Sequence, residues 1–211
     1  MTARRFQPYQ TTMMDRYPRL FRLVRARLGD GPHLRLLSFG CAGGDEVLSL
    51  RRYFPQAAII GQDISRRAIL QARFKLWRAG LAGISLRRAD STADLASDSF
   101  DAVFAMAVFR HGKLGRQPWP PSCRPLLAFA DFERAIADLA RCLRPGGLLV
   151  IRYAHFRFAD TMTAAGFAVV ECDAAPNQAP LYGPDDRLLA DSAYGQLVFL
   201  KTSPQDSLRF A

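Results

Sequence analysis

The sequence predicts an α/β fold in which helices cover a mostly parallel β-sheet. After Pro32, short apolar runs typical of buried strands alternate with segments that have a helical period. The chain of 211 residues is long enough for one sizeable core and too short for two ordinary ones. Apolar residues make up 49% of it and charged residues 23%, which is an ordinary globular composition. We therefore expect one α/β domain.

Residues 1–31 are expected to form an arm and a basic helix ahead of that domain. Residues 1–12 have no clear period, whereas a helix is predicted from Asp15, with Pro18 in its first turn. Its apolar residues recur at spacings of three and four: Tyr17, Leu20, Phe21, Val24 and Leu28. The opposite face carries Arg16, Arg19, Arg22 and Arg27. This face is either solvated or part of a lid that binds anions.

The domain is expected over residues 32–203, with a tail at 204–211. Strands are predicted at 34–39, 57–61, 84–87, 100–109 and 148–153, and two more at 167–171 and 196–201. Helices are predicted at 45–54, 65–79 and 131–143, and residues 144–147 form a turn before the fifth strand. Two proline-containing stretches, 112–125 and 174–186, interrupt this alternation. They are either walls of an active site or surface insertions.

Composition also limits where the protein works and what it binds. The longest apolar run, residues 102–109, is too short to span a membrane, and the first residues lack the apolar core of a signal peptide. We therefore expect a cytoplasmic protein without a membrane partner. The four cysteines are scattered without a C-x-x-C pair, so neither a metal site nor a disulfide framework is expected.

The net charge of +10 raises the question of a nucleic-acid partner. Only three basic residues are lysines, and the joint excess of arginine and alanine is what a GC-rich genome would produce. A nucleic-acid partner is therefore possible but not favoured. Residues 1–30 hold seven arginines against Asp15 and Asp30, so an acidic partner would be sought there.

A glycine-rich turn follows the first strand. Gly40, Gly43 and Gly44, with the small Ala42, let the backbone approach a ligand closely. Asp63 follows the second strand, where a carboxylate can accept hydrogen bonds from both hydroxyls of a ribose. The pattern indicates a nucleoside-containing ligand.

The acidic residues after this turn decide between two such ligands. Asp45 and Glu46 occupy the first turn of the predicted helix, where they would repel the diphosphate of a dinucleotide. S-adenosylmethionine has no phosphate and carries a sulfonium and an ammonium group. The acidic turn therefore favours S-adenosylmethionine over NAD.

Residues 36–46, Leu-Leu-Ser-Phe-Gly-Cys-Ala-Gly-Gly-Asp-Glu, resemble motif I of class I S-adenosylmethionine-dependent methyltransferases. They are most similar to the variant of chemotaxis-receptor methyltransferases, which has a small residue followed by two acids. The resemblance continues through residues 59–65, 87–91, 99–106 and 142–151, in the family's order and spacing, and covers about residues 33–201. It implies a Rossmann-like, doubly wound sheet of seven strands in the order 3-2-1-4-5-7-6, with strand 7 antiparallel. It also implies S-adenosylmethionine as cofactor and S-adenosylhomocysteine as product.

The resemblance implies a role for each matched position. Gly40, Ala42 and Gly44 would flank the methionine moiety of the cofactor. Asp63, followed by Ile64, would hold the ribose, Asp90 and Ser91 would meet the adenine, and Met106 would lie near the cofactor. The chain departs from the family at Ser38, where many members have an acid, and at Ala42, which replaces a glycine.

Residues just past the fourth and fifth predicted strands are candidates for binding the methyl acceptor. His111 and His155 could act as a general base or orient the substrate, or they could merely hydrogen-bond loop backbone. The candidates for substrate binding are Arg110, Arg152, Tyr153, Arg157 and Trp119. The arginines would hold a carboxylate or phosphate on the acceptor.

We therefore expect a methyltransferase that acts on an O, N or S atom of a small, acidic or aromatic metabolite. One alternative is an RNA or protein methyltransferase that docks through the arginine-rich N-terminus. The other is a cofactor-binding pseudoenzyme or partner subunit, suggested by the departures at Ser38 and Ala42. The sequence does not indicate the oligomeric state.

Overall fold

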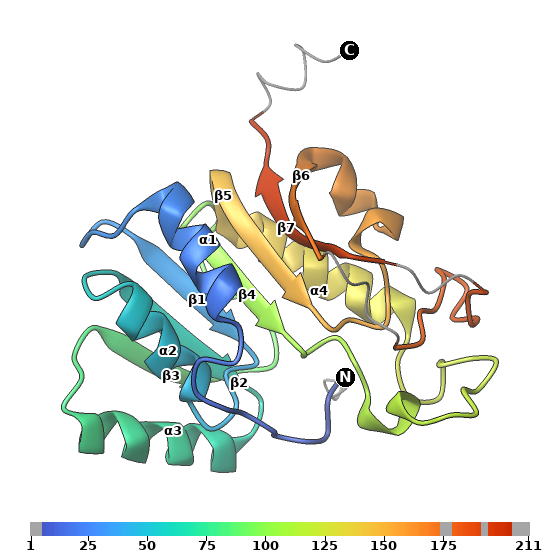
Figure 1. Cartoon of the computed structure of the whole chain (residues 1–211), viewed down its shortest axis with the longest axis horizontal. Helices are drawn as coiled ribbons and strands as arrows, with labels where there is room; N and C mark the ends of the chain where they lie inside the picture. The colour runs from blue at the N-terminus through green and yellow to red at the C-terminus, as the bar shows by residue number, and fades with distance from the viewer. Residues whose placement is uncertain (1–5, 174–178, 191–193, 204–211) are drawn as a thin grey trace.

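The computed structural model describes residues 6–173, 179–190 and 194–203 (Figure 1). The predicted 204–211 tail, the first five residues of the arm and part of the 174–186 stretch lie outside these ranges. The described residues form a seven-stranded sheet of order β3-β2-β1-β4-β5-β7-β6. This order confirms the predicted fold class.

Five parallel strands form most of the sheet. These are β1 (Arg35–Phe39), β2 (Ala58–Asp63), β3 (Ile84–Arg88), β4 (Phe100–Met106) and β5 (Leu143–Arg152). The last two strands are β6 (Phe167–Cys172) and β7 (Gln196–Lys201). Strand β7 runs antiparallel between β5 and β6, as predicted.

Four helices and three 3₁₀ turns complete the part of the fold that the structure describes. The helices are α1 (Pro18–Leu28), α2 (Asp45–Tyr53), α3 (Arg66–Ala79) and α4 (Phe129–Cys142). The 3₁₀ turns are η1 (Gly112–Gly115), η2 (Phe158–Asp160) and η3 (Met162–Gly166). Local chemistry explains the ends of α3. The Ser65 hydroxyl accepts a hydrogen bond from the Ala68 N–H, and Gly80 ends the helix with φ +62°.

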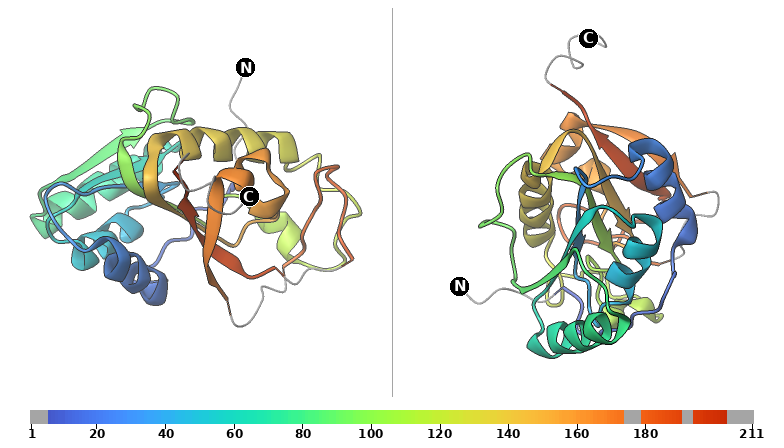
Figure 2. Two further views of the ribbon diagram at one scale, coloured as in Figure 1. Left: turned by 90° about the horizontal axis from the view of Figure 1, so that it is seen from above. Right: turned by 90° about the vertical axis from the view of Figure 1, so that its left-hand side faces the viewer.

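The helices cover both faces of the sheet. Helices α1, α2 and α3 pack on one face, where Phe21 and Val47 join a buried cluster with Leu36. Helix α4 packs on the other face, where Phe132 joins a second cluster with Leu37. Figure 2 shows α4 and α1 on opposite sides of the sheet. Because successive strand residues point to opposite faces, β1 serves both layers.

The helix expected from Asp15 begins at Pro18, and two of the predicted strand boundaries were wrong by three residues or more. The fourth strand ends at Met106 rather than at residue 109, because Ala107 has φ +58° and turns the chain away from the sheet. The fifth strand begins at Leu143 rather than at residue 148. Leu143 pairs with Phe100 across a β-bulge, so the predicted turn at 144–147 lies within the strand.

The 112–125 stretch is anchored to the domain and is not a free insertion. It contains η1, and its Leu114 and Cys123 side chains are buried. The Cys123 N–H donates to the carbonyl of Asp186, whose carboxylate accepts from the N–H of Phe129 at the start of α4. The second irregular stretch therefore ties the first one to the domain.

Three findings concern membranes, metals and thiols. Within the described ranges, no helix is long and apolar enough to cross a membrane. The same residues contain no group of three or more His, Cys, Asp or Glu side chains arranged to hold a metal ion. All four cysteines are free; Cys41, Cys123 and Cys142 are buried, and Cys172 is exposed.

Candidate functional site

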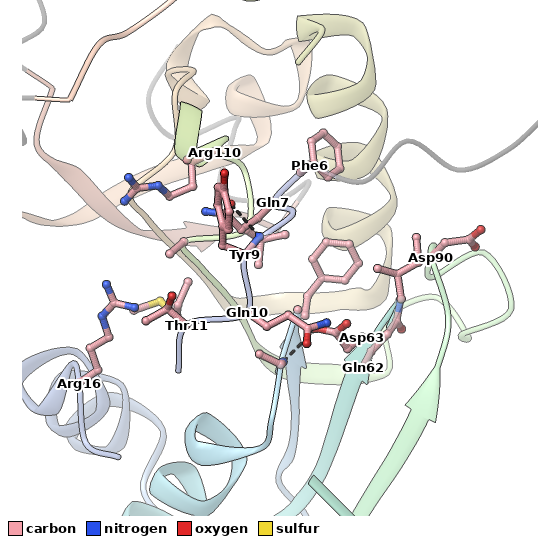
Figure 3. A pocket seen from close by; sticks show the side chains of 18 of the residues that line it. Phe6, Gln7, Tyr9, Gln10, Thr11, Arg16, Gln62, Asp63, Asp90 and Arg110 are labelled. Carbon is pink, nitrogen blue, oxygen red and sulfur yellow. Dashed lines mark hydrogen bonds between the residues drawn. The ribbon is translucent and has the colours of Figure 1, made fainter. Parts of the chain in front are cut away.

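A cavity of about 610 Å³ lies at the carboxyl ends of β1, β2 and β4 (Figure 3). Ligands of doubly wound sheets bind at this edge. Six of the eight residues predicted to bind the cofactor line the cavity: Gly40, Ala42, Asp63, Ile64, Asp90 and Met106. Arg110, predicted to bind the substrate, lines it as well.

The turn after β1 brings bare backbone to the cavity. Gly40 has φ +79°, and a Cβ atom at this position would lie 2.3 Å from a methyl carbon of Val108. A larger residue is therefore excluded by both its backbone angle and its neighbour. Ala42 also has a positive φ, of 47°, and its N–H donates to the Asp63 carboxylate.

Asp63 is held in place at the end of β2. Its Oδ2 accepts from the N–H of Ala42 at 2.9 Å, and its Oδ1 accepts from the N–H of Ser65 at 2.8 Å. An ionised carboxylate has about four acceptor sites, so each oxygen can accept another hydrogen bond. Asp63 can therefore accept from a pair of hydroxyls while its own position stays fixed.

Gly44 and Ser91 do not line the cavity. Gly44 caps α2 with φ +93°, and a Cβ atom there would lie 2.8 Å from Cβ of Ala72 in α3. This glycine therefore allows α2 and α3 to pack closely. The carbonyl of Ser91 accepts a hydrogen bond from the Gln62 side chain, which does line the cavity. Ser91 thus acts on the cavity through Gln62.

Glu46 is a site residue that the motif comparison missed. It lines a side cavity of about 40 Å³ together with Gly40, Ala42 and Met106, which also line the main cavity. The Ser38 hydroxyl donates to Glu46 Oε1 at 2.6 Å. Burial raises the pKa of Glu46 to about 8, although Ser38 and the nearby Arg16 oppose this shift. The serine that replaces the family's acid thus contacts an acid eight positions later.

The two acids after the glycine turn have different environments. Asp45 forms an ion pair with Lys75 of α3, and it does not line either cavity. Glu46 has no such cation within ion-pair distance among the described residues. Asp45 is thus neutralised by a cation, and the raised pKa of Glu46 leaves its carboxyl largely protonated at pH 7, so the turn repels a diphosphate less than two free carboxylates would.

The N-terminal arm forms one wall of the cavity, contributed by Phe6, Gln7, Tyr9, Gln10 and Thr11. Phe6 packs edge-on against Phe109, with ring centroids 5.2 Å apart. At the other end of the arm, the N–H of Asp15 donates to the Ser49 hydroxyl of α2. The arm is thus attached on both sides of the cavity, and its aperiodic sequence gave no sign of this.

Cationic side chains line a different part of the cavity from Asp63 and Asp90. Arg110, Lys113 and Arg116 follow β4, and Arg16 precedes α1. Figure 3 shows Arg16 and Arg110 on one side and the two acids on the other. No ion pair joins these four cations to a described acid, although ten other basic side chains do form such pairs. Arg110 Nε is buried and has no hydrogen-bond partner among the described residues.

The two candidate histidines lie in the packed loops and do not line the main cavity. His155 Nδ1 lies 2.9 Å from the carbonyl oxygen of Pro180, and Nε2 lies 3.3 Å from that of His111. Burial lowers the pKa of His155 to about 4, so the ring is neutral at pH 7 and donates through one nitrogen only. His111 Nδ1 accepts from the N–H of Lys113 and caps η1. These positions support the backbone-bonding alternative rather than a catalytic one.

The other predicted substrate residues lie outside the main cavity. Arg152 and Tyr153 line a separate cavity of about 30 Å³, where Arg152 forms an ion pair with Asp173. Arg157 directly precedes η2, and Trp119 is partly exposed in the 112–125 stretch. Only Arg110 of the predicted substrate residues therefore joins the predicted cofactor residues.

Comparison with known proteins identifies relatives of the chain. A family model described as a methyltransferase domain matches residues 37–151. A demethylmenaquinone methyltransferase of Thermus thermophilus is 31% identical over 56% of this chain and 46% of its own length. A trans-aconitate 2-methyltransferase of Deinococcus radiodurans is 26% identical over 61% of this chain and 41% of its own. The chain thus matches less than half of either relative.

Nucleic-acid enzymes are also among the relatives. A tRNA (guanine-N(7)-)-methyltransferase of Anaeromyxobacter dehalogenans is 30% identical over 64% of this chain and 65% of its own length. A solved structure from Clostridium thermocellum, described as an rRNA methylase, matches 92% of this chain and 99% of its own with a TM-score of 0.58. Its 14% sequence identity is evidence for the fold alone. The family model covers more than half of the sequence, and this chain therefore belongs to the methyltransferase-domain family, as its resemblance to class I S-adenosylmethionine-dependent methyltransferases predicted.

Proposed function

We propose that this chain transfers a methyl group from S-adenosylmethionine to a small anionic acceptor. The observation that carries the proposal is the division of charge in one cavity. Asp63 and Asp90 lie on one side, and Arg110, Lys113 and Arg116 line the part that follows β4. The two carboxylates can accept hydrogen bonds from the nucleoside of the cofactor, and the cations can bind an anionic acceptor.

The residues of the cavity fit the cofactor. When bound, S-adenosylmethionine supplies a methyl group on a sulfonium. Asp63 would accept hydrogen bonds from the ribose hydroxyls, and Glu46 would hold the ammonium in the side cavity. Gln62 Oε1 is buried without a partner among the described residues, so it can accept one more hydrogen bond from the ligand. Gly40 lets the Val108 side chain pack directly against the turn, and both residues would border the methionine chain.

The acceptor group that fits best is a carboxylate. Its oxygen is already ionised at pH 7, so methylation needs no general base, and neither His111 nor His155 lines the cavity. The acceptor oxygen forms a bond to the methyl carbon as the carbon–sulfur bond breaks, and the electron pair leaves on sulfur. No proton moves. Arg110 and its neighbours would therefore act by binding the carboxylate of the acceptor.

The test uses the whole chain with S-adenosylmethionine labelled in its methyl group. Di- and tricarboxylic acids, including trans-aconitate, are compared with phenols, amines and single-stranded RNA as acceptors. We expect label in a base-labile methyl ester of an acid. Arg110→Gln should raise the KM for this acid at least tenfold and leave kcat and cofactor affinity nearly unchanged. Arg134→Gln, on the outer surface of α4, is the matched control.

Each other outcome contradicts a separate part of the proposal. Label in a neutral acceptor would contradict the proposed acidic substrate but would still demonstrate methyltransferase activity. Cofactor binding without transfer to any acceptor would make the protein a cofactor-binding pseudoenzyme. Transfer to RNA with a steep salt dependence would support the nucleic-acid alternative. The surface proposed for RNA is partly engaged within the fold, because Arg19 pairs with Glu171 and Arg25 donates to the Tyr53 carbonyl.

A further inference from the structure

Helix α3 exposes large apolar side chains on the face turned away from the sheet. Leu70, Phe74 and Trp77 are 53%, 57% and 77% exposed, and Leu81 just beyond the helix is 37% exposed. At 3.6 residues per turn, these positions lie along one stripe. The Phe74 and Trp77 rings contact each other, with centroids 5.9 Å apart. We call these four side chains the α3 stripe.

Packing of the core does not explain the α3 stripe. The inward face of α3 is formed by Ala68, Ile69, Ala72 and Leu76, and all four are buried. Helix α3 is therefore apolar on two opposite sides, and the sheet covers only one of them. Figure 1 shows α3 at the margin of the molecule, with no other helix or strand of the described residues over its outer side. An exposed cluster of this kind indicates an interaction surface.

Positive charge borders the α3 stripe on both sides. Helical geometry places Arg66 and Arg73 along one edge and Arg67 and Arg78 along the other, and all four side chains are exposed. The 14 residues of α3 include no acid. None of these four arginines pairs with an acid in the described part of the chain. The surface is thus an apolar stripe between two rows of cations.

The charge selects among the occupants of this surface. A second copy would bring the same four arginines face to face, because a symmetric dimer uses the same patch on both subunits. Single-stranded RNA would use the two aromatic rings for stacking but would leave Leu70 and Leu81 without a role. An anionic lipid surface would contact both the apolar α3 stripe and the arginines that border it. Leu, Phe and Trp insert below the headgroups, and arginines at the helix edges contact the phosphates.

We propose that α3 is a peripheral docking surface for membranes that contain anionic lipids. The helix lies flat on the bilayer, with the α3 stripe among the upper acyl carbons and the bordering arginines at the headgroups. This binding is reversible and does not need a membrane-spanning segment. It is also independent of the proposed methyl transfer, because α3 contributes its outer side to the membrane and its inner side to the core.

Vesicle binding tests the proposal on the full chain. We expect the protein to sediment with vesicles of phosphatidylcholine and phosphatidylglycerol, weakly with phosphatidylcholine alone, and less as salt rises. Phe74→Gln combined with Trp77→Gln should lower the partition coefficient at least tenfold, and so should Arg73→Gln combined with Arg78→Gln. Met162→Gln is the matched control: Met162 is an exposed apolar residue (87%) beside α4, on the opposite face of the sheet from α3, and this variant should bind vesicles normally.

Fluorescence locates the contact independently of the variants. The chain has two tryptophans, so Trp119→Phe leaves Trp77 as the single reporter. Its emission should shift to the blue when anionic vesicles are added. An unshifted emission, or vesicle binding that survives both double substitutions, would overturn the proposal. The proposal would also be overturned if the protein did not bind vesicles but bound single-stranded RNA or dimerised in solution, and if the Phe74 and Trp77 variant lost that interaction.

Discussion

Glu46 is the residue whose ionisation should link cofactor binding to pH. Burial raises the pKa of its carboxyl to about 8 from an ordinary 4.5. The Glu46 carboxyl therefore keeps its proton unless a cation lies beside it, and a bound ammonium group would replace that proton. Because the pKa is raised in the folded protein, Glu46 favours folding most below pH 4.5. That contribution is lost as the pH rises to about 8.

Glu46→Gln should therefore weaken cofactor binding and stabilise the free protein. In the unsubstituted protein, affinity for S-adenosylmethionine should rise between pH 6 and pH 8 as Glu46 becomes easier to ionise. The variant should lose this slope and bind at least tenfold more weakly at pH 8, by calorimetry. Its free energy of unfolding in urea should exceed that of the unsubstituted protein at pH 8 by about 1 to 2 kcal/mol, since the carboxylate is partly hydrated through the cavity.

Asp45→Asn is the matched control for Glu46→Gln. Asp45 is the adjacent acid, but its partner is Lys75 and it lies outside both cavities. Cofactor affinity and its pH slope should therefore remain in this variant. Equal losses in the two variants would show that general negative charge, rather than the Glu46 contact, favours the cofactor.

Single residues could be predicted where one motif position has one physical role. Asp63 ends β2, whose carboxyl end borders the cavity, so predicting the strand was enough to place this residue at the site. Glu46 could not be found this way, because its contact with Ser38 depends on how α2 leaves the glycine turn. The departure at Ser38 was the available signal, since a missing acid in a charged site calls for a replacement nearby.

At the scale of elements, His155 joins three loops that are distant in sequence. Its backbone N–H donates to the Phe109 carbonyl, and its backbone carbonyl accepts from the Tyr182 N–H. Its ring contacts the carbonyl of Pro180. The loops after β4 and β5 and the segment from residue 179 therefore meet at this one residue, and its buried ring fills the space between them. This arrangement predicts a structural role.

His155→Ala should destabilise the protein without removing a catalytic group. Loss of a fully buried ring and its hydrogen bond should cost about 2 to 4 kcal/mol. Thermal unfolding should then occur at a melting temperature lower by about 4 to 16 °C, at about 2 to 4 °C for each kcal/mol. Turnover per folded molecule, measured below the transition, should be nearly unchanged. A large loss of kcat in a stably folded variant would restore the catalytic interpretation.

Elements were predictable where hydrophobic pattern alone decides them, as in β1 and α3. The end of β4 was not, because residues 107–109 continue the apolar run of the strand and the turn depends on the positive φ of Ala107. The arm was not predictable either. Its contact with Phe109 and its attachment to α2 are long-range, and its own sequence has no period to reveal them.

At the scale of the whole molecule, the strand order followed from the order of five motifs and the resemblance they carry. What the sequence could not supply was the shape of the cavity, because five separate segments form it: the arm and the loops after β1, β2, β3 and β4. A ligand in this cavity would contact segments from residue 6 to residue 116. Binding should therefore stabilise the molecule as one unit.

Adding S-adenosylmethionine at about 100 times its Kd should raise the free energy of unfolding by about 2.7 kcal/mol. For a chain of this length the melting temperature should rise by about 5 to 10 °C. Hydrogen exchange should slow in residues 6–12 of the arm as well as in the glycine turn, because both border the cavity. Asp63→Asn should abolish both effects, whereas Arg134→Gln should keep them. Protection confined to the glycine turn would show that the arm is a wall of the empty cavity only and does not hold the cofactor.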